Sequence, residues 1–308
     1  AIALKADGKL KCGVKIKMEG CRLCPRECGA ARSKGAGFCG AGEKLRAARI
    51  APHFWEEPII SGTRGTGAVF FSGCSLKCVF CQNYSLSHKS LGREMADDSF
   101  INALQRLKEQ GVHNFSLVNP THYSAVLARI FNKWPAGIPV IYNSGGFDNL
   151  ESLKAAEAYA DVYLPDFKLM DESRCGRYLG FEGYAMYAKR AIKEMLRQRP
   201  EPVYDENGLI ISGVIIRHLV LPCNVDQSKK IIDWLWDNVP RQTPISIMSQ
   251  YFPAGRAKDY PEINRCLTVR EYEAVVDYFL SKGFINGYIQ ELSSQSPEYV
   301  PEFDFTGM

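Results

Sequence analysis

Three cysteines within eight residues are the side chains of this chain best suited to redox chemistry. Cys74, Cys78 and Cys81 follow the apolar stretch 68–72, whose composition is typical of a buried β-strand. Iron-sulfur clusters are usually held by four cysteine thiolates, so three thiolates leave one iron without a protein ligand. An open metal position is typical of a catalytic site, whereas a structural site closes its coordination shell. The spacing therefore predicts a cluster whose fourth iron binds a chelating molecule.

A zinc ion is the alternative interpretation of this segment. It would take its fourth ligand from elsewhere in the chain, such as His88 or Cys39. Zinc sites usually show paired Cys-x2-Cys spacings, and this segment contains a single triplet. The position after a predicted strand also favours the cluster, because the carboxyl ends of barrel strands usually carry the active site.

Four more cysteines form a second group near the start of the chain. They are Cys21, Cys24, Cys28 and Cys39, in a segment rich in glycine. Four thiolates complete a metal shell, so both structural zinc and an auxiliary iron-sulfur cluster fit. The spacing of the first three favours iron-sulfur, whereas Cys39-Gly40 is typical of a zinc knuckle, and the choice stays open. Cys12 is a spare candidate ligand.

The cysteines are not needed as disulfides. A chain of 308 residues, 46% of them hydrophobic, can bury roughly three quarters of its unfolded surface without covalent staples. The first 17 residues contain five lysines and no apolar run typical of a secretory signal. The longest apolar runs are far shorter than about 18 residues, so no membrane span is expected. We therefore expect a cytoplasmic protein with reduced thiols.

Positive charge is concentrated at the start of the chain. Residues 1–50 contain 12 Lys and Arg against 4 Asp and Glu, a net charge of +8, and the remainder is at −4. A basic patch attracts nucleic acid or an acidic protein, but cations around a thiolate-rich metal site produce the same excess. The charge pattern by itself therefore does not indicate nucleic-acid binding.

From residue 66 onward, short apolar runs alternate with amphipathic stretches, a pattern typical of βα units around a mainly parallel sheet. The expected strands cover residues 68–72, 115–118, 140–143, 162–165, 214–221, 245–249 and 288–292. The expected helices cover residues 97–110, 123–134, 149–159, 184–199, 226–239 and 269–282. A short hairpin is expected over 203–211, where Glu206-Asn207-Gly208 separates two apolar runs.

The predicted fold class is α/β. Six or seven repeats predict a full or partial (β/α) TIM-type barrel preceded by a small N-terminal cysteine-rich module. We place the basic metal-binding module at residues 1–62, the barrel at 63–295 and a C-terminal tail at 296–308. The tail contains acidic residues and two prolines, and we expect it to lie irregularly on the barrel.

The segment Cys74-Ser-Leu-Lys-Cys78-Val-Phe80-Cys81 resembles the cysteine loop of the radical S-adenosylmethionine enzymes. The resemblance implies that the three cysteines hold a 4Fe-4S cluster and that S-adenosylmethionine chelates the fourth iron. It places Phe80 beside the adenine. It also implies that one electron cleaves the cofactor to a 5′-deoxyadenosyl radical, which removes a hydrogen atom from the substrate, while the barrel orients the reactants and excludes water.

Further segments within residues 66–292 resemble the activating enzymes of glycyl-radical enzymes, typified by pyruvate formate-lyase activating enzyme. Asp166 and Lys168 match that group's Asp-x-Lys motif near the radical, and their spacing puts both on one face of a strand end. The resemblance makes them the candidate catalytic residues. It implies that the cofactor is also bound by residues Asn143, Ser144, Arg217 and Tyr251.

The chain departs from the family after the expected strand 115–118. Radical S-adenosylmethionine enzymes usually carry Gly-Gly-Glu there, and the glutamate holds the amino group of the cofactor. Here the residues are Asn119-Pro120-Thr121-His122. Asn119 and Thr121 can form hydrogen bonds with the cofactor but supply no carboxylate, so the amino group must be held differently.

The predicted function is hydrogen abstraction from a protein or peptide backbone, as in activation of a glycyl-radical enzyme, with a reduced flavodoxin or ferredoxin as electron donor. One alternative is a radical enzyme that acts on a small molecule or installs a stable peptide modification. A second alternative is a zinc-containing adaptor whose basic module binds nucleic acid, although basic character alone is a weak indication. No membrane partner is expected.

Overall fold

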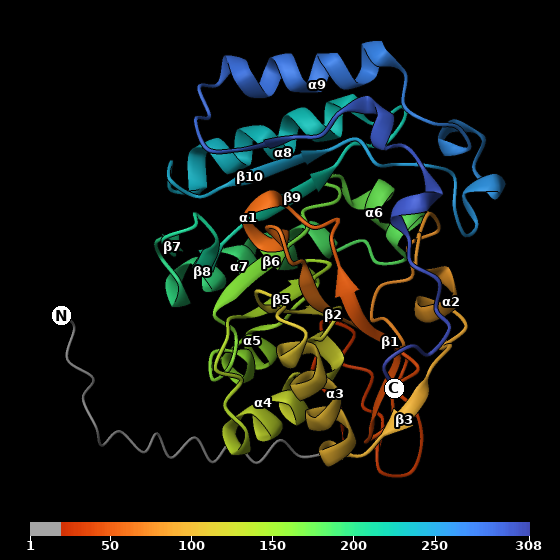
Figure 1. The fold of residues 1–308 in the computed structure, drawn as a ribbon. Helices are drawn as coiled ribbons and strands as arrows, with labels where there is room; N and C mark the ends of the chain where they lie inside the picture. The colour runs from red at the N-terminus through yellow and green to blue at the C-terminus, as the bar shows by residue number, and fades with distance from the viewer. Residues whose placement is uncertain (1–19) are drawn as a thin grey trace.

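A computed structural model describes residues 20–308 of the chain (Figure 1). These residues form an α/β fold built on mainly parallel strands, which confirms the predicted fold class. Cys12 and the rest of residues 1–19 lie outside the described residues. Among the described residues, no helix is both long and apolar enough to cross a bilayer.

Eight strands of the described chain form the larger sheet, in the order β3-β1-β2-β4-β5-β6-β8-β7. The strands from β2 to β8 in this order run parallel, and β1, β3 and β7 pair antiparallel with their neighbours. The strands are β1 (Leu45–His53), β2 (Thr66–Phe71), β3 (Arg93–Met95), β4 (Phe115–Val118), β5 (Val140–Ser144), β6 (Val162–Pro165), β7 (Val203–Tyr204) and β8 (Ile210–Val214). The β7–β8 pair confirms the hairpin expected over 203–211.

A smaller parallel sheet continues the arc. It contains β9 (Ile216–Leu219), β10 (Ile245–Met248) and β11 (Gly287–Ile289), with β10 in the centre. Within residues 20–308, no strand closes the arc between β11 and the β1–β3 edge. The described fold therefore corresponds to a partial barrel, and a closed one is not observed.

The single strand expected over 214–221 is wrong in detail, because it is divided between the two sheets. The peptide N–H of Ile215 donates to the carbonyl of Tyr163 on β6 (2.9 Å), and that of Ile216 donates to the carbonyl of Pro244 before β10 (3.0 Å). Consecutive N–H groups of an extended segment point to opposite sides. The segment therefore pairs with β6 up to Ile215 and with the β10 side from Ile216 onward. A parallel bridge between Asp166 and Arg217 joins the two sheets.

The six expected helices are observed, and three short helices, α1, α2 and α6, are added to them. The helices of the described chain are α1 (Pro58–Ser61), α2 (Tyr84–Ser87), α3 (Asp97–Glu109), α4 (Ser124–Lys133), α5 (Leu150–Ala156), α6 (Glu172–Leu179), α7 (Tyr184–Gln198), α8 (Val225–Asn238) and α9 (Val269–Ser281). Short 3-10 turns are η1 (Thr121–Tyr123), η2 (Ala257–Asp259), η3 (Pro261–Ile263), η4 (Leu292–Ser294) and η5 (Pro297–Tyr299). Helix α6 is short and contains Gly176, which is why its pattern is weak in the sequence. It begins where the Asp171 carboxylate accepts the N–H of Arg174.

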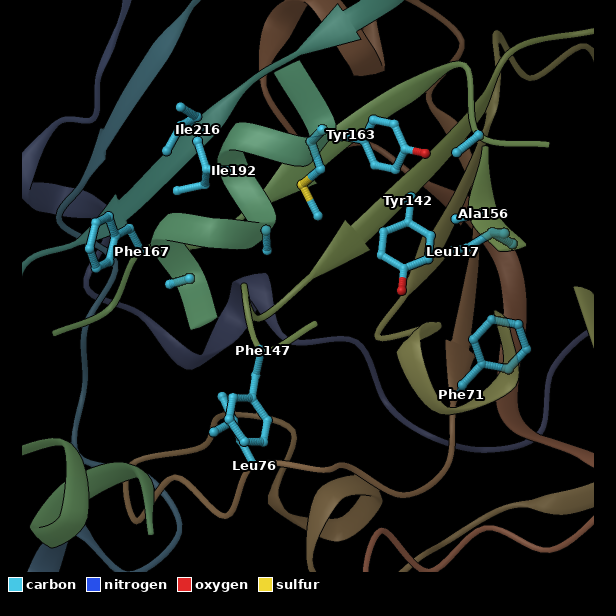
Figure 2. Packing of buried hydrophobic residues seen from close by; sticks show 14 of the residues in the cluster. Phe71, Leu76, Leu117, Tyr142, Phe147, Ala156, Tyr163, Phe167, Ile192 and Ile216 are labelled. Atoms are coloured by element: carbon cyan, nitrogen blue, oxygen red, sulfur yellow. The ribbon is translucent and has the colours of Figure 1, made fainter. Parts of the chain in front are cut away.

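A large apolar core lies between the strands and the helices (Figure 2). Tyr142 and Tyr163 project from neighbouring strands towards α7, which contributes Ile192. All three side chains are fully buried. Burying a large apolar side chain stabilises the fold by roughly 1.5–3 kcal/mol, so this core holds the strand ends rigidly in place.

The two ends of the described chain both pack on the large sheet. Strand β1 lies inside the predicted module 1–62 but pairs with β2, so the cysteine-rich segment continues directly into the sheet. The tail runs beside the same strand, where Phe305 donates its N–H to the Ala48 carbonyl and the Thr306 carbonyl accepts from Ile50, each at 2.9 Å. In Figure 1 the C-terminus accordingly lies next to β1 and β3.

Candidate functional site

A cavity of about 320 Å³ extends from the carboxyl ends of the parallel strands to residues 53–58, which end and follow β1. Its wall includes the cysteine loop after β2 and the residues that follow β4, β5 and β6. Strands β9 and β10 complete the wall, and residues 299–301 of the tail line its edge. Barrels usually carry their active sites at this end, so the cavity is the first candidate for one.

The cysteine loop is held in place by its neighbours on both sides. Lys77 and Val79 donate their N–H groups to the carbonyls of Leu179 and Tyr178 at the end of α6, at 3.1 and 2.9 Å. From the other side, the Arg26 guanidinium donates to the carbonyl of Ser75 at 2.9 Å. The loop is therefore fixed before anything binds to it.

The three loop thiols form a donor set that fits an iron-sulfur cluster. Cys74, Cys78 and Cys81 all line the cavity, and the Ser87 hydroxyl donates to the sulfur of Cys81 at 3.1 Å. Burial raises the pKa of Cys74 to about 11 and also raises the pKa values of the other two thiols. Buried thiols of this kind become thiolates only when a cation compensates their charge, and soft thiolates suit iron-sulfur clusters.

In residues 20–308, no three His, Cys, Asp or Glu side chains stand ready as a metal cage. A bound metal would therefore have to draw the thiols together. Since all three belong to one short loop, side-chain rotation is the simplest adjustment.

A closed network of charged residues lines the same cavity. The Arg217 guanidinium donates to Asp166 Oδ1 at 2.9 Å, to Glu56 Oε2 at 3.0 Å and to Asn143 Oδ1 at 2.7 Å. Lys168 Nζ lies 2.5 Å from Asp166 Oδ2. The side chains of the four charged residues are only 8–17% exposed. The network therefore combines two positive and two negative charges in a buried site.

The network keeps Asp166 and Lys168 charged. Burial alone would raise the pKa of Asp166, but the charges of Arg217 and Lys168 outweigh burial and hold that pKa below its usual value. For Lys168, burial opposes the charged form, yet the Asp166 carboxylate raises the lysine's pKa above its usual value. Both groups therefore stay charged over the whole neutral range.

Most predicted site residues lie on the cavity wall. These are Phe80, Asn119, Asn143, Ser144, Asp166, Lys168 and Arg217, together with the three loop cysteines. Asn119 has a left-handed backbone conformation (φ 61°), and its side-chain amide donates to the carbonyl of Gly73 at 2.8 Å. This hydrogen bond links the end of β4, where Gly-Gly-Glu is absent, to Gly73, the residue before Cys74.

Thr121 and Tyr251, also predicted to bind the cofactor, are not among the residues that line the cavity. The Thr121 hydroxyl donates to the buried carboxylate of Asp148 at 2.6 Å. The Tyr251 hydroxyl donates to the carbonyl of Ile263 at 2.6 Å, and its ring packs edge-on behind Phe80 with centroids 6.0 Å apart. Both hydroxyls are therefore used for internal packing.

Glu56 and Glu57 on the cavity wall were missed by sequence reasoning. They follow β1, a strand that was not expected and that lies within the predicted metal module 1–62, so nothing placed them near the barrel interior. Two adjacent carboxylates between the apolar residues Trp55 and Pro58 were a usable signal. Acidic residues in an apolar stretch are rarely buried unless they are paired or functional.

The N-terminal cysteines gather next to the same loop. Cys21, Cys24 and Cys39 are buried, and Cys28 is exposed. Burial, helped by the charges of the other three cysteines, raises the pKa of Cys24 to about 12. The carbonyl of Cys39 accepts the N–H of Cys74 at 3.0 Å. The two cysteine groups are therefore in direct backbone contact.

Comparison with known proteins gives a limited resemblance. No protein-family model matches the chain. An uncharacterized protein of Methanocaldococcus jannaschii is 29% identical over 269 residues, which cover 83% of this chain and 73% of that protein.

Two solved structures align with part of the chain. Streptococcus suis SuiB bound to S-adenosylmethionine aligns with a TM-score of 0.49 and 16% identity, over 73% of this chain and 50% of that chain. A domain of pyruvate-formate lyase-activating enzyme from Bacteroides vulgatus aligns with a TM-score of 0.39 and 13% identity, over 56% of this chain and 91% of that chain. The chain thus spans about half the length of SuiB. At these values, the function has to be argued from the chain's own residues.

Proposed function

We propose that this protein is a radical S-adenosylmethionine enzyme that holds a 4Fe-4S cluster on Cys74, Cys78 and Cys81. The supporting observation is that three buried thiols of one loop share a cavity with a buried charge network at the carboxyl ends of parallel strands. When bound, the reduced cluster supplies the electron that cleaves S-adenosylmethionine to methionine and a 5′-deoxyadenosyl radical, which takes a hydrogen atom from the substrate.

The residues of the chain bind and orient the reactants. Three thiolates bring negative charge into a buried site, and Lys168 is the nearby cation that opposes the rise in the pKa of Cys78. The ring of Phe80, backed by Tyr251, offers an apolar surface for the adenine beside the loop. Asp166 and Arg217 hold one another and are therefore preorganised to keep polar groups of the cofactor or substrate in a fixed orientation.

We further propose that the hydrogen atom is taken from a protein or peptide backbone, most simply from a glycine of a glycyl-radical enzyme. The Asp166-Phe167-Lys168 segment supports this branch, because both charged side chains line the cavity as the resemblance implies. The electron then comes from a cytoplasmic donor such as a reduced flavodoxin or ferredoxin, for which dithionite can substitute in the assay.

Electron paramagnetic resonance tests this function. The anaerobically reconstituted protein is reduced and incubated with S-adenosylmethionine and a glycyl-radical enzyme from the same organism. A carbon-centred doublet on the partner is the expected result. A partner that acquires a mass change without a radical would instead indicate a stable peptide modification. A partner that is unchanged while a small molecule is consumed would contradict a backbone substrate.

We propose that the N-terminal cysteines hold a second metal site, either zinc or an auxiliary iron-sulfur cluster. Their number and mutual proximity support this proposal. We expect Cys24→Ala to lose the metal of this site and to retain about four iron atoms per chain at the other. Elemental analysis of the two Cys→Ala variants at positions 24 and 78 makes the comparison, and the metal that Cys24→Ala loses identifies the site. Unchanged metal content in Cys24→Ala would contradict the proposal.

A further inference from the structure

Glu57 is a buried carboxyl group on the cavity wall that the charge network does not use. Its side chain lines the cavity, and the residue is only 8% exposed. Its Oε2 atom is buried and has no hydrogen-bond partner among the described residues. Buried polar atoms almost always have a partner, so this orphan acceptor indicates a ligand that supplies one.

The network cannot supply the missing partner. Glu56, the preceding residue, accepts from Arg217 on one oxygen and from Asn143 on the other, each at 3.0 Å. Arg217 also donates to Asp166 and Asn143, and none of its hydrogen bonds goes to Glu57. The two positive charges of the network are already matched by two negative charges, so an ionised Glu57 adds an uncompensated negative charge. Burial raises the pKa of Glu57, and the charge of Arg217 offsets this rise only in part.

Glu57 lies at the end of the barrel opposite the cysteines. It follows β1, whose last residue His53 pairs with Thr66, the first residue of β2. Cys74 follows the other end of β2, which spans six residues or about 17 Å. A cofactor held at the cysteine loop therefore leaves Glu57 free for a different ligand.

The surroundings of Glu57 suit a nitrogen cation. Ser246 on β10 and Tyr288 on β11 are paired on neighbouring strands, and both line the cavity. Tyr288 is close enough for the Glu57 charge to add to the effect of burial in raising the tyrosine's pKa. A hydroxyl and a phenol can accept hydrogen bonds from a donor that is also bound to the carboxylate.

We infer that Glu57, with Ser246 and Tyr288, binds an ammonium or guanidinium group of the substrate. This inference rests on the proposed function, because it takes the cavity to hold the substrate as well as the cofactor. For a peptide substrate, the group would be a basic side chain or the N-terminal amine. The carboxylate then gains the partner that it lacks, and the net charge of the cavity returns to balance.

The test compares two probes that differ in charge but hardly in shape, n-butylguanidine and n-butylurea. Calorimetry measures their binding to the full-length reconstituted protein with S-adenosylmethionine present. We expect the wild type to bind n-butylguanidine at least about tenfold more tightly than n-butylurea, as for a charge-assisted bond in a buried site. Glu57→Gln should remove this preference. The matched control is Glu201→Gln, which removes an exposed negative charge outside the cavity and should keep the preference.

Equal affinities for the two probes in the wild type would overturn the inference, as would a preference that persists in Glu57→Gln. Urea denaturation provides the control for folding, and Glu57→Gln should be at least as stable as the wild type because it removes an uncompensated buried acid. The assay needs no turnover. The binding measurement and the radical reaction can therefore fail independently of each other.

Discussion

Cys78→Ala should lose more than 99% of the S-adenosylmethionine cleavage of the wild type. Even residues that only support a metal ligand typically cost about 10–100-fold when they are replaced, so removing one of three ligands should cost more. The thiol lies on the cavity wall, on the loop fixed by α6. The measurement is 5′-deoxyadenosine formed per chain under reducing, anaerobic conditions, with the absorbance of the cluster recorded on the same sample.

The matched control is Cys266→Ser. Cys266 is an exposed free thiol that does not line the cavity, so its replacement should leave both the cluster and the cleavage rate unchanged. Equal losses in the two variants would indicate general sensitivity to cysteine replacement. Full activity in Cys78→Ala would show that the loop is not the cluster site.

Arg217→Met is the substitution with the largest expected effect on stability. The guanidinium donates to Asp166, Glu56 and Asn143, and its side chain is only 12% exposed. Removing it leaves two carboxylates in a buried site with Lys168 as the remaining cation. Breaking a buried ion network of this kind typically costs about 3–5 kcal/mol of unfolding free energy. Urea denaturation of the reconstituted protein measures the change.

A surface arginine provides the comparison for this prediction. Arg129 pairs with Asp97 at 2.9 Å, but its side chain is 55% exposed. Exposed pairs contribute about 0–1 kcal/mol, so Arg129→Met should barely move the unfolding midpoint. A loss for Arg217→Met as small as that for Arg129→Met would show that the network is not needed for folding.

The order of helices and strands was largely predictable, because it follows from local patterns. Strands, amphipathic helices and the residues that begin or end them are encoded in short stretches of sequence. In α9, for example, Thr268 and Glu271 form a capping box at the start of the helix. The cysteine loop was predictable for the same reason. Its three thiols are close in sequence, so any fold that places a strand before them brings them to one site.

The remainder of the site depends on contacts between distant segments. Glu56 reaches Arg217 across 161 positions of the chain, and no local pattern records that pairing. Thr121 is well placed in sequence, but its hydroxyl turns away because Asp148 lies buried beside it. The division at Ile215 arises because neighbouring strands change there, which a pattern of apolar residues does not reveal.

Production of 5′-deoxyadenosine tests the central claim most directly. The full-length protein is reconstituted anaerobically with iron and sulfide, reduced with dithionite and given S-adenosylmethionine, and the products are separated by chromatography. The account predicts 5′-deoxyadenosine and methionine in equal amounts, formed only with the reductant present. A protein that carries the full cluster and binds S-adenosylmethionine but yields no 5′-deoxyadenosine would contradict it.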